Sequence, residues 1–277
     1  MIIVTDSMCD YSLEDAAARD VIMLSLKVSF GDETFEDKRT LSPAQFYQRL
    51  DALGKDDELP KTSLVNVQGF LDVFEANPSE PIVVICASAK LSGTYDSAVA
   101  AQRIAGRDDI FVINTTTISC GQAMLVDIAC DMRDAGTPAA DIAAYLDRES
   151  KRVKIYAIVD SLKCLVKGGR LSPLKAAFAS ALSIKPVVML TDGAVENTCK
   201  GRNTANAIKA LMRYIPEKCP LDPSMPVAFS HTGDLEGAQL LKDMAGYPDH
   251  KVYWLGCVVG THCGPGTLVM AYFMKED

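Results

Sequence analysis

The sequence predicts a two-domain α/β protein, because strand-like and helix-like segments alternate in its first half and this alternation changes in its second half. The strand-like segments are short apolar runs, and amphipathic stretches follow them. Such alternation predicts a mainly parallel sheet with helices on both faces. After about residue 150 a hairpin signal joins two strands, which indicates a mixed sheet.

We therefore place a domain boundary near residue 150. The chain has 277 residues, which is long enough for two domains. Residues 1–150 are expected to form an N-terminal α/β domain with a parallel sheet flanked by helices. Residues 151–277 are expected to form a C-terminal α/β domain with a mixed sheet and helices.

In the first half, each predicted helix follows an apolar run typical of a buried strand. These runs lie at 2–5, 21–26, 82–86 and 110–113. One helix has a distinct start, since Ser42 is a capping residue, Pro43 suits the first helical position and Gln45 stands three residues after the cap. Thr137-Pro138 and Ser172-Pro173 repeat the cap-plus-proline pattern.

In the second half, a turn at Asp192-Gly193 predicts a hairpin. The expected strands lie at 153–159, 185–190, 227–230, 252–258 and 268–273. Helices are expected shortly after residue 159, at 174–182 and from about 202 to 215.

The composition excludes several classes of partner and site. Acidic residues outnumber basic ones by 36 to 28, for a net charge of −8, which argues against nucleic acid or an anionic membrane as the main partner. No apolar run has the ~18 residues of a membrane span, and the N-terminus lacks the basic region of a signal peptide. We therefore expect a cytoplasmic protein without membrane insertion.

The nine cysteines are scattered and none forms Cys-x-x-Cys. This pattern favours reduced, buried thiols over a disulfide framework. Cys257, His262 and Cys263 are close in sequence but have no evident fourth ligand. We expect no metal site and no cofactor.

Residues 90–98, Lys-Leu-Ser-Gly-Thr-Tyr-Asp-Ser-Ala, join a predicted strand to a predicted helix. Ser88, Ser92, Gly93 and Thr94 stand at this junction, and hydroxyls beside the free N–H groups of a helix start suit an anion. The stretch has neither a phosphate-binding glycine loop nor the Gly-x-Ser-x-Gly motif of serine hydrolases. Ser92 can be a helix cap, a carboxylate contact or a nucleophile served by a histidine.

Two other junctions offer similar groups. Thr62-Ser63 lies in a predicted loop before a helix, and Asp6-Ser7 ends the first strand. A carboxylate at Asp6 would repel a bound anion unless one of the two acids is protonated. We therefore expect Asp6 to accept hydrogen bonds from nearby backbone N–H groups.

Six segments, in order along the whole chain, resemble motifs of the DegV family of fatty-acid-binding proteins. They are VTDSMCDYS at 4–12, KTSLV at 61–65, KLSGTYDSA at 90–98, VKGGRLS at 166–172, IKPVVML at 184–190 followed by Asp192-Gly193, and VVGTHCGPGTL at 258–268. The resemblance implies a two-domain fold that buries one long-chain, palmitate-like fatty acid. It also implies a carrier, not an enzyme, that presents this acid to a separate fatty acid kinase, which makes acyl phosphate.

Residue by residue, the resemblance implies carboxylate contacts from Thr62 and Ser92. Ser63, Gly93 and Thr94 stand beside them, and His262 is a further ligand contact. Arg170 and Arg202 are candidates for the head-group side or for the surface that faces the kinase. The chain departs from the family pattern at 64–66, where Leu-Val-Asn replaces Gln-Pro-Ser, and at 114–115, where Asn-Thr replaces Asp-Ser.

The small residues after Gly-Gly-Arg can line a tunnel for the acyl chain or can pack tightly on a sheet. They are Ala176, Ala177, Phe178 and Ala181. Two other functions remain open. One is a stand-alone acyl hydrolase or kinase-like enzyme that uses Ser92 and His262, and the other is an interaction protein with an empty core.

Overall fold

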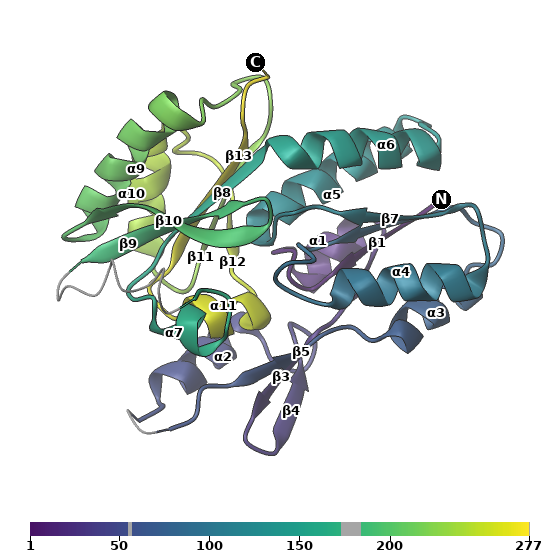
Figure 1. The fold of residues 1–277 in the computed structure, drawn as a ribbon, viewed down its shortest axis with the longest axis horizontal. Helices are drawn as coiled ribbons and strands as arrows, with labels where there is room; N and C mark the ends of the chain where they lie inside the picture. Colours follow the sequence, from purple (N-terminus) through teal and green to yellow (C-terminus); the bar gives the residue numbers. More distant parts are fainter. Residues whose placement is uncertain (55–56, 173–183, 277) are drawn as a thin grey trace.

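The computed structural model describes residues 1–54, 57–172 and 184–276, and it contains three sheets. Figure 1 shows a parallel sheet on the N-terminal side, a larger mixed sheet on the C-terminal side and a small sheet below them. The parallel sheet is built from residues before 150 and the mixed sheet from residues after it. We propose that the domain boundary lies between them, near residue 150.

The parallel sheet has the strand order β2-β1-β6-β7. Its strands are β1 (Ile2–Asp6), β2 (Val21–Leu24), β6 (Ile82–Cys86) and β7 (Ile110–Asn114). The helices of this half are α1 (Leu13–Ala18), α3 (Val67–Ala76), α4 (Thr94–Ala105), α5 (Ser119–Asp134) and α6 (Ala139–Glu149). In Figure 1, α5 and α6 cover one face of the sheet, and α3 and α4 cover the other. The predicted parallel sheet with helices on both faces is confirmed.

The mixed sheet has the strand order β10-β9-β8-β13-β11-β12. Its strands are β8 (Val153–Ile158), β9 (Lys185–Thr191), β10 (Ala194–Gly201), β11 (Val227–His231), β12 (Val252–Trp254) and β13 (Leu268–Phe273). Only the β11–β12 pair is parallel among the described pairs of this sheet. Helices α9 (Thr204–Lys218) and α10 (Leu235–Ala245) lie on one face.

Helix α5 connects the two sheets, because it packs on strands of both. Gly121 allows this close approach. A Cβ at Gly121 would lie 2.5 Å from Thr117 Oγ1 and 3.3 Å from a methyl carbon of Val153 on β8. The largest hydrophobic core accordingly combines buried residues from both halves of the chain.

The hairpin predicted at Asp192-Gly193 is confirmed. Asp192 has φ 48° and Gly193 has φ 80°, so both residues adopt the left-handed conformation that a two-residue turn between β9 and β10 requires. The start of α2 (Pro43–Asp51) is confirmed as well. The Ser42 and Gln45 side chains each accept a hydrogen bond from the other residue's backbone N–H.

The small sheet, with the order β4-β3-β5, was not predicted. Its strands are β3 (Lys27–Phe30), β4 (Glu33–Glu36) and β5 (Lys61–Ser63). The run predicted as one strand at 21–26 ends at Leu24, and β3 begins three residues later. Thr62 and Ser63 belong to β5 and not to a loop, because their segment pairs with β3.

Two further predictions were wrong. The expected strand at 252–258 ends at Trp254, and the helix α11 (Cys257–Cys263) follows. Asp37 Oδ1 accepts the first N–H of this helix, at Cys257, over 2.9 Å. This tertiary contact outweighs the strand preference of the local valines. Thr137 is not a cap either, since Pro138 is itself the N-cap of α6 and no side chain caps it.

The predicted helix at 174–182 and Pro173 of the Ser172-Pro173 signal lie outside the described residues. A short helix, α7 (Lys163–Lys167), follows β8 as expected. No helix among the residues that the structure describes is long and apolar enough to cross a bilayer.

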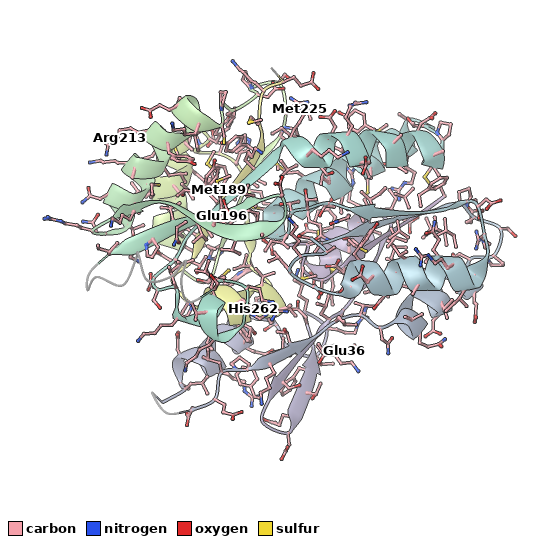
Figure 2. The ribbon with its side chains drawn as sticks, in the orientation of Figure 1. Glu36, Met189, Glu196, Arg213, Met225 and His262 are labelled. Carbon is pink, nitrogen blue, oxygen red and sulfur yellow. The ribbon has the colours of Figure 1, made fainter. Side chains whose placement is uncertain are left out.

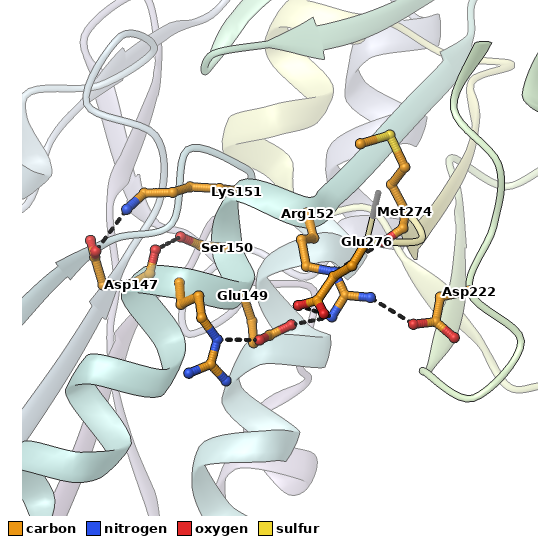
Figure 3. A network of polar contacts seen from close by, with 9 residues as sticks. Asp147, Glu149, Ser150, Lys151, Arg152, Asp222, Met274 and Glu276 are labelled. Carbon is orange, nitrogen blue, oxygen red and sulfur yellow. Dashed lines mark hydrogen bonds and ion pairs between the residues drawn. The ribbon is translucent and has the colours of Figure 1, made fainter.

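An ion-pair network holds the chain where its two halves meet (Figure 3). Arg152, at the end of the 3₁₀ turn η1 (Ser150–Arg152), contacts Glu149 and Asp222, each at 2.6 Å. Arg152 Nε also donates to the carbonyl of Met274 over 3.0 Å. Because the Glu149 side chain is only 3% exposed, this network anchors α6 and the C-terminal segment to each other.

Candidate functional site

A cavity of about 390 Å³ lies between the two halves of the chain. Its apolar wall comes mainly from the mixed sheet, and part of it comes from α11. Representative lining residues are Ile155, Ala157, Val188, Leu190, Val195 and Val259. Met8 follows β1 and Ser92 lies in the turn after β6, so the cavity reaches the carboxyl ends of the parallel strands, where α/β sheets bind ligands.

Three elements supply the predicted ligand-binding residues that line the cavity. β5 supplies Thr62 and Ser63, the turn before α4 supplies Ser92 and Gly93, and α11 supplies His262. Figure 2 shows His262 on α11 near the centre of the molecule, below Met189 of the mixed sheet. A mostly apolar cavity with a few polar groups is typical of small-molecule sites.

Ser92 is positioned by its local turn. Gly93, and not Ser92, is the N-cap of α4. The Ser92 hydroxyl accepts a hydrogen bond from the Thr94 N–H over 3.3 Å and lies 3.0 Å from Thr94 Oγ1. Thr94 is fully buried and is not among the lining residues, so it orients Ser92 from behind the wall.

His262 lies against Thr62. The distance from Thr62 Oγ1 to His262 Nε2 is 3.2 Å, and His262 Nδ1 is buried without a hydrogen-bond partner among the described residues. Burial, with a smaller contribution from Arg170, lowers the pKa of His262 to about 4. The imidazole is therefore neutral at pH 7 and adds no charge to the polar end of the cavity.

Arg170 also lies in the cavity wall, where it fixes the turn that carries Ser92. Its Nε and Nη2 donate to the Leu91 carbonyl over 3.2 and 3.1 Å, and Nη1 donates to the Gly168 carbonyl over 2.6 Å. Burial lowers the pKa of this guanidinium. Arg202 lies elsewhere: it is exposed, stands just before α9 and is not among the lining residues.

The buried carboxyl groups near the site accept hydrogen bonds from backbone N–H groups and from hydroxyl groups of the protein. Asp6 accepts hydrogen bonds from the N–H groups of Met8 over 3.0 Å and Ala87 over 2.8 Å, in agreement with the local role expected for it. Burial raises the pKa of Asp6 to about 6. These contacts leave the hydroxyls, and not the acids, at the polar end of the cavity.

Sequence reasoning missed Asp10 and Ser119. Ser119 lines the cavity and donates to the Asp10 carboxylate, which also accepts from Ser230 Oγ over 2.5 Å. Burial raises the pKa of Asp10. No local motif marks this pair, because three distant segments of the chain bring the residues together. The four predicted tunnel residues, Ala176, Ala177, Phe178 and Ala181, lie outside the described residues.

The geometry does not assemble a serine nucleophile. His262 hydrogen-bonds to Thr62, whereas Ser92 hydrogen-bonds to Thr94. A triad needs a third group to orient the base, and within the described ranges His262 Nδ1 has no such partner. Across these same residues no group of three or more His, Cys, Asp or Glu side chains could hold a metal.

Comparison with known proteins gives the same family throughout. The model of the family described as "Uncharacterised protein, DegV family" matches residues 1–275. A DegV domain-containing protein of Halalkalibacterium halodurans is 31% identical, over 99% of this chain and 98% of the relative.

Solved structures agree with this match. A DegV family protein from Thermus thermophilus, described as fatty acid binding, is 27% identical with a TM-score of 0.85, over 99% of both chains. A stearic acid-binding protein from Eubacterium ventriosum is also 27% identical with a TM-score of 0.85, over 99% of both chains.

Proposed function

Because this chain belongs to the DegV family, we propose that it binds one long-chain fatty acid in the cavity between its two halves. The observation that carries this proposal is the form of the cavity. Its wall is apolar along the mixed sheet, and Thr62, Ser92 and His262 are among its polar groups. Thr62 hydrogen-bonds to His262, and the turn of Ser92 lies against the end of β5, since a Cβ at Gly93 would lie 2.9 Å from Leu64 Cδ2.

The acyl chain supplies most of the affinity. Each buried methylene contributes about 0.8 kcal/mol, so a long chain contributes more than the few hydrogen bonds of the head group. The valines and leucines of the mixed sheet provide the apolar contact. The head-group contacts therefore orient the acid and need not dominate its binding.

The carboxylate is held by neutral donors. The hydroxyls of Thr62 and Ser92 can each donate to a carboxylate oxygen, and Gly93 places backbone at the same position without a side chain. When Nε2 of neutral His262 carries the proton, it donates to Thr62 Oγ1 and leaves the threonine hydrogen for the carboxylate. The histidine then acts as a positioning residue for Thr62.

The protein acts as a carrier, and chemistry on the bound acid belongs to another protein. The family resemblance suggests a fatty acid kinase as that partner, with Arg202 as a residue that faces it. The hydrogen bonds of Ser92 and His262 support a carrier, since they do not connect these two residues. All nine cysteines are unpaired in the structure, which is typical of the reducing cytoplasm.

One experiment tests the ligand class. The protein is purified and denatured, the released lipid is extracted, and mass spectrometry identifies and quantifies it. We expect an equimolar long-chain fatty acid. A protein that releases no acid and does not take one up from solution would contradict the proposal.

A further inference from the structure

One polar residue of the cavity wall lies apart from the predicted head-group contacts. Ser119, the first residue of α5, lines the cavity and donates its hydroxyl hydrogen to the Asp10 carboxylate. The same carboxylate accepts a hydrogen bond from the Gly256 N–H over 3.3 Å. Gly256 is the N-cap of α11, whereas His262 lies in the last turn of that helix. Ser119 therefore lies near one end of α11 and the predicted head-group contacts near the other.

The cavity runs along α11 between these two ends. The residues of this segment that line it recur at helical spacing on one side, and they are Leu255, Val258, Val259, His262 and Cys263. From Gly256 to His262 the helix advances six residues, which is about 9 Å at 1.5 Å per residue. A fatty acid whose carboxylate lies beside His262 therefore reaches Ser119 with the middle of its acyl chain.

The hydrogen of the Ser119 hydroxyl is already used. Asp10 accepts it, and the same carboxylate accepts the Ser230 hydroxyl over 2.5 Å. Burial raises the pKa of Asp10, but the charge of Lys38 and the hydrogen bonds from both serines favour the carboxylate. Ser119 Oγ keeps its acceptor lone pairs, and no N–H or O–H group of the described residues donates to it. The oxygen can thus accept a hydrogen bond from a ligand, but it has no hydrogen left to donate.

The wall around Ser119 is apolar. The Ser119 N–H donates to the Met8 carbonyl over 2.8 Å, and both Met8 and Ile118 line the cavity. Val269, another lining residue, pairs with Ser230 between β13 and β11. A hydroxyl group buried among such side chains without a partner weakens binding, because it loses its hydrogen bonds to water. Ser119 offers a partner at one position along the chain.

We propose that Ser119 accepts a hydrogen bond from a hydroxyl group on the acyl chain, so that the cavity binds hydroxylated long-chain fatty acids. This inference rests on the proposed fatty-acid function and names a substrate class for the same cavity. The site distinguishes a hydroxyl from an oxo group. A hydroxyl donates a hydrogen, whereas a carbonyl oxygen only accepts one, and Asp10 already holds the hydrogen of Ser119.

The test compares stearic acid with hydroxystearic acids that differ in the position of the hydroxyl, each measured by displacement of a fluorescent fatty acid. For wild type, we expect one mid-chain position to bind within about threefold of stearic acid and the other mid-chain positions to bind about tenfold more weakly. Stearic acid with an oxo group at the favoured position should also bind about tenfold more weakly than stearic acid.

Ser119→Gly is the variant that removes the acceptor. Ser119 has φ 59°, a conformation that glycine adopts readily, so this substitution suits the backbone. It should weaken binding of the favoured hydroxystearic acid about tenfold and leave stearic acid within about twofold of wild type. The matched control is Ser230→Ala, which removes another hydroxyl from Asp10 at a buried residue that is not among the described lining residues. The control should keep the favoured position.

Three results would overturn the inference. The first is equal weakening at every hydroxyl position in wild type, which needs no variant to be folded. The second is a favoured position that persists in Ser119→Gly, and the third is one that Ser230→Ala abolishes to the same extent. If stearic acid itself does not bind the wild type, the proposed function fails instead.

Discussion

Thr62 and His262 are joined by a hydrogen bond of 3.2 Å across 200 residues of sequence. Thr62 belongs to β5 of the small sheet, and His262 lies in the last turn of α11. Their contact brings the small sheet and α11 together at the polar end of the cavity. The orientation of the Thr62 hydroxyl therefore depends on a residue from the other half of the chain.

The two hydroxyls are expected to share the head group. Thr62→Ala and Ser92→Ala should each weaken fatty acid binding on the order of tenfold, because hydrogen bonds to a charged group contribute about 1.5–3 kcal/mol. Displacement of a fluorescent fatty acid measures the change. Ser79→Ala, at an exposed serine between α3 and β6 that does not line the cavity, is the control. Wild-type affinity in the Thr62→Ala/Ser92→Ala variant would place the carboxylate elsewhere.

His262 is expected to make the folded state less stable in acid. Its pKa in the folded protein is about 4, below the ordinary value of 6.5, so the unfolded chain takes up the proton first. The contribution of His262 to the free energy of unfolding is complete above pH 6.5. As the pH falls toward 4, the free energy of unfolding decreases by at most about 3 kcal/mol.

Urea unfolding of wild type and His262→Gln between pH 4 and 7 measures this effect. The difference in free energy of unfolding between the two proteins should shrink as the pH falls. His250→Gln, at an exposed histidine, should follow the wild-type slope. If the free energies of unfolding of wild type and His262→Gln depend on pH in the same way, His262 has the same pKa in the folded and unfolded states.

Gly260 is expected to tolerate no side chain. A Cβ at this position would lie 2.2 Å from the Tyr47 hydroxyl oxygen and 3.0 Å from Cε1 of Phe46, both on α2. Gly260→Ala should therefore destabilise the fold by about 1–3 kcal/mol through overpacking. The same substitution in a Tyr47→Phe background should cost less, since the nearest atom is gone. Equal costs in both backgrounds, measured by urea unfolding, would rule out this contact as the cause.

Arg202 is expected to affect the rate of the kinase reaction without affecting the affinity for the fatty acid. Arg202→Ala should leave the fatty acid affinity unchanged, because Arg202 is exposed and does not line the cavity. With the cognate kinase it should slow the formation of acyl phosphate. Arg213→Ala, at another exposed arginine (Figure 2), is the matched control. If the Arg202→Ala variant forms acyl phosphate at the wild-type rate, Arg202 does not contact the kinase.

The sequence was sufficient for the elements whose signals are local. The buried run 82–86, the cap at Ser42 and the turn at Asp192-Gly193 each determine their own conformation. Thr62, Ser92 and His262 were named from the sequence and line the cavity, although only the family resemblance singled out His262. Their contact with a ligand stays a prediction.

The remaining features depend on contacts between distant segments. β5 has three residues and forms only because β3 lies beside it. The start of α11 is held by Asp37, which is 220 residues away in sequence. The pair of Asp10 and Ser119 is likewise visible only after folding, because hydroxyl and carboxyl residues are common and their spacing carries no period.

The carboxylates of Asp10 and Asp37 belong to the N-terminal half, yet they accept hydrogen bonds from the backbone N–H groups of Gly256 and Cys257. The segment that leads into α11 thus has its polar backbone satisfied by side chains from the opposite half. Neither half can be exchanged with an unrelated partner and keep a complete binding site. The site therefore needs both halves of one chain. Cutting the chain at residue 150, or joining either half to an unrelated one, separates hydrogen-bond donors from their acceptors in the interior of the protein.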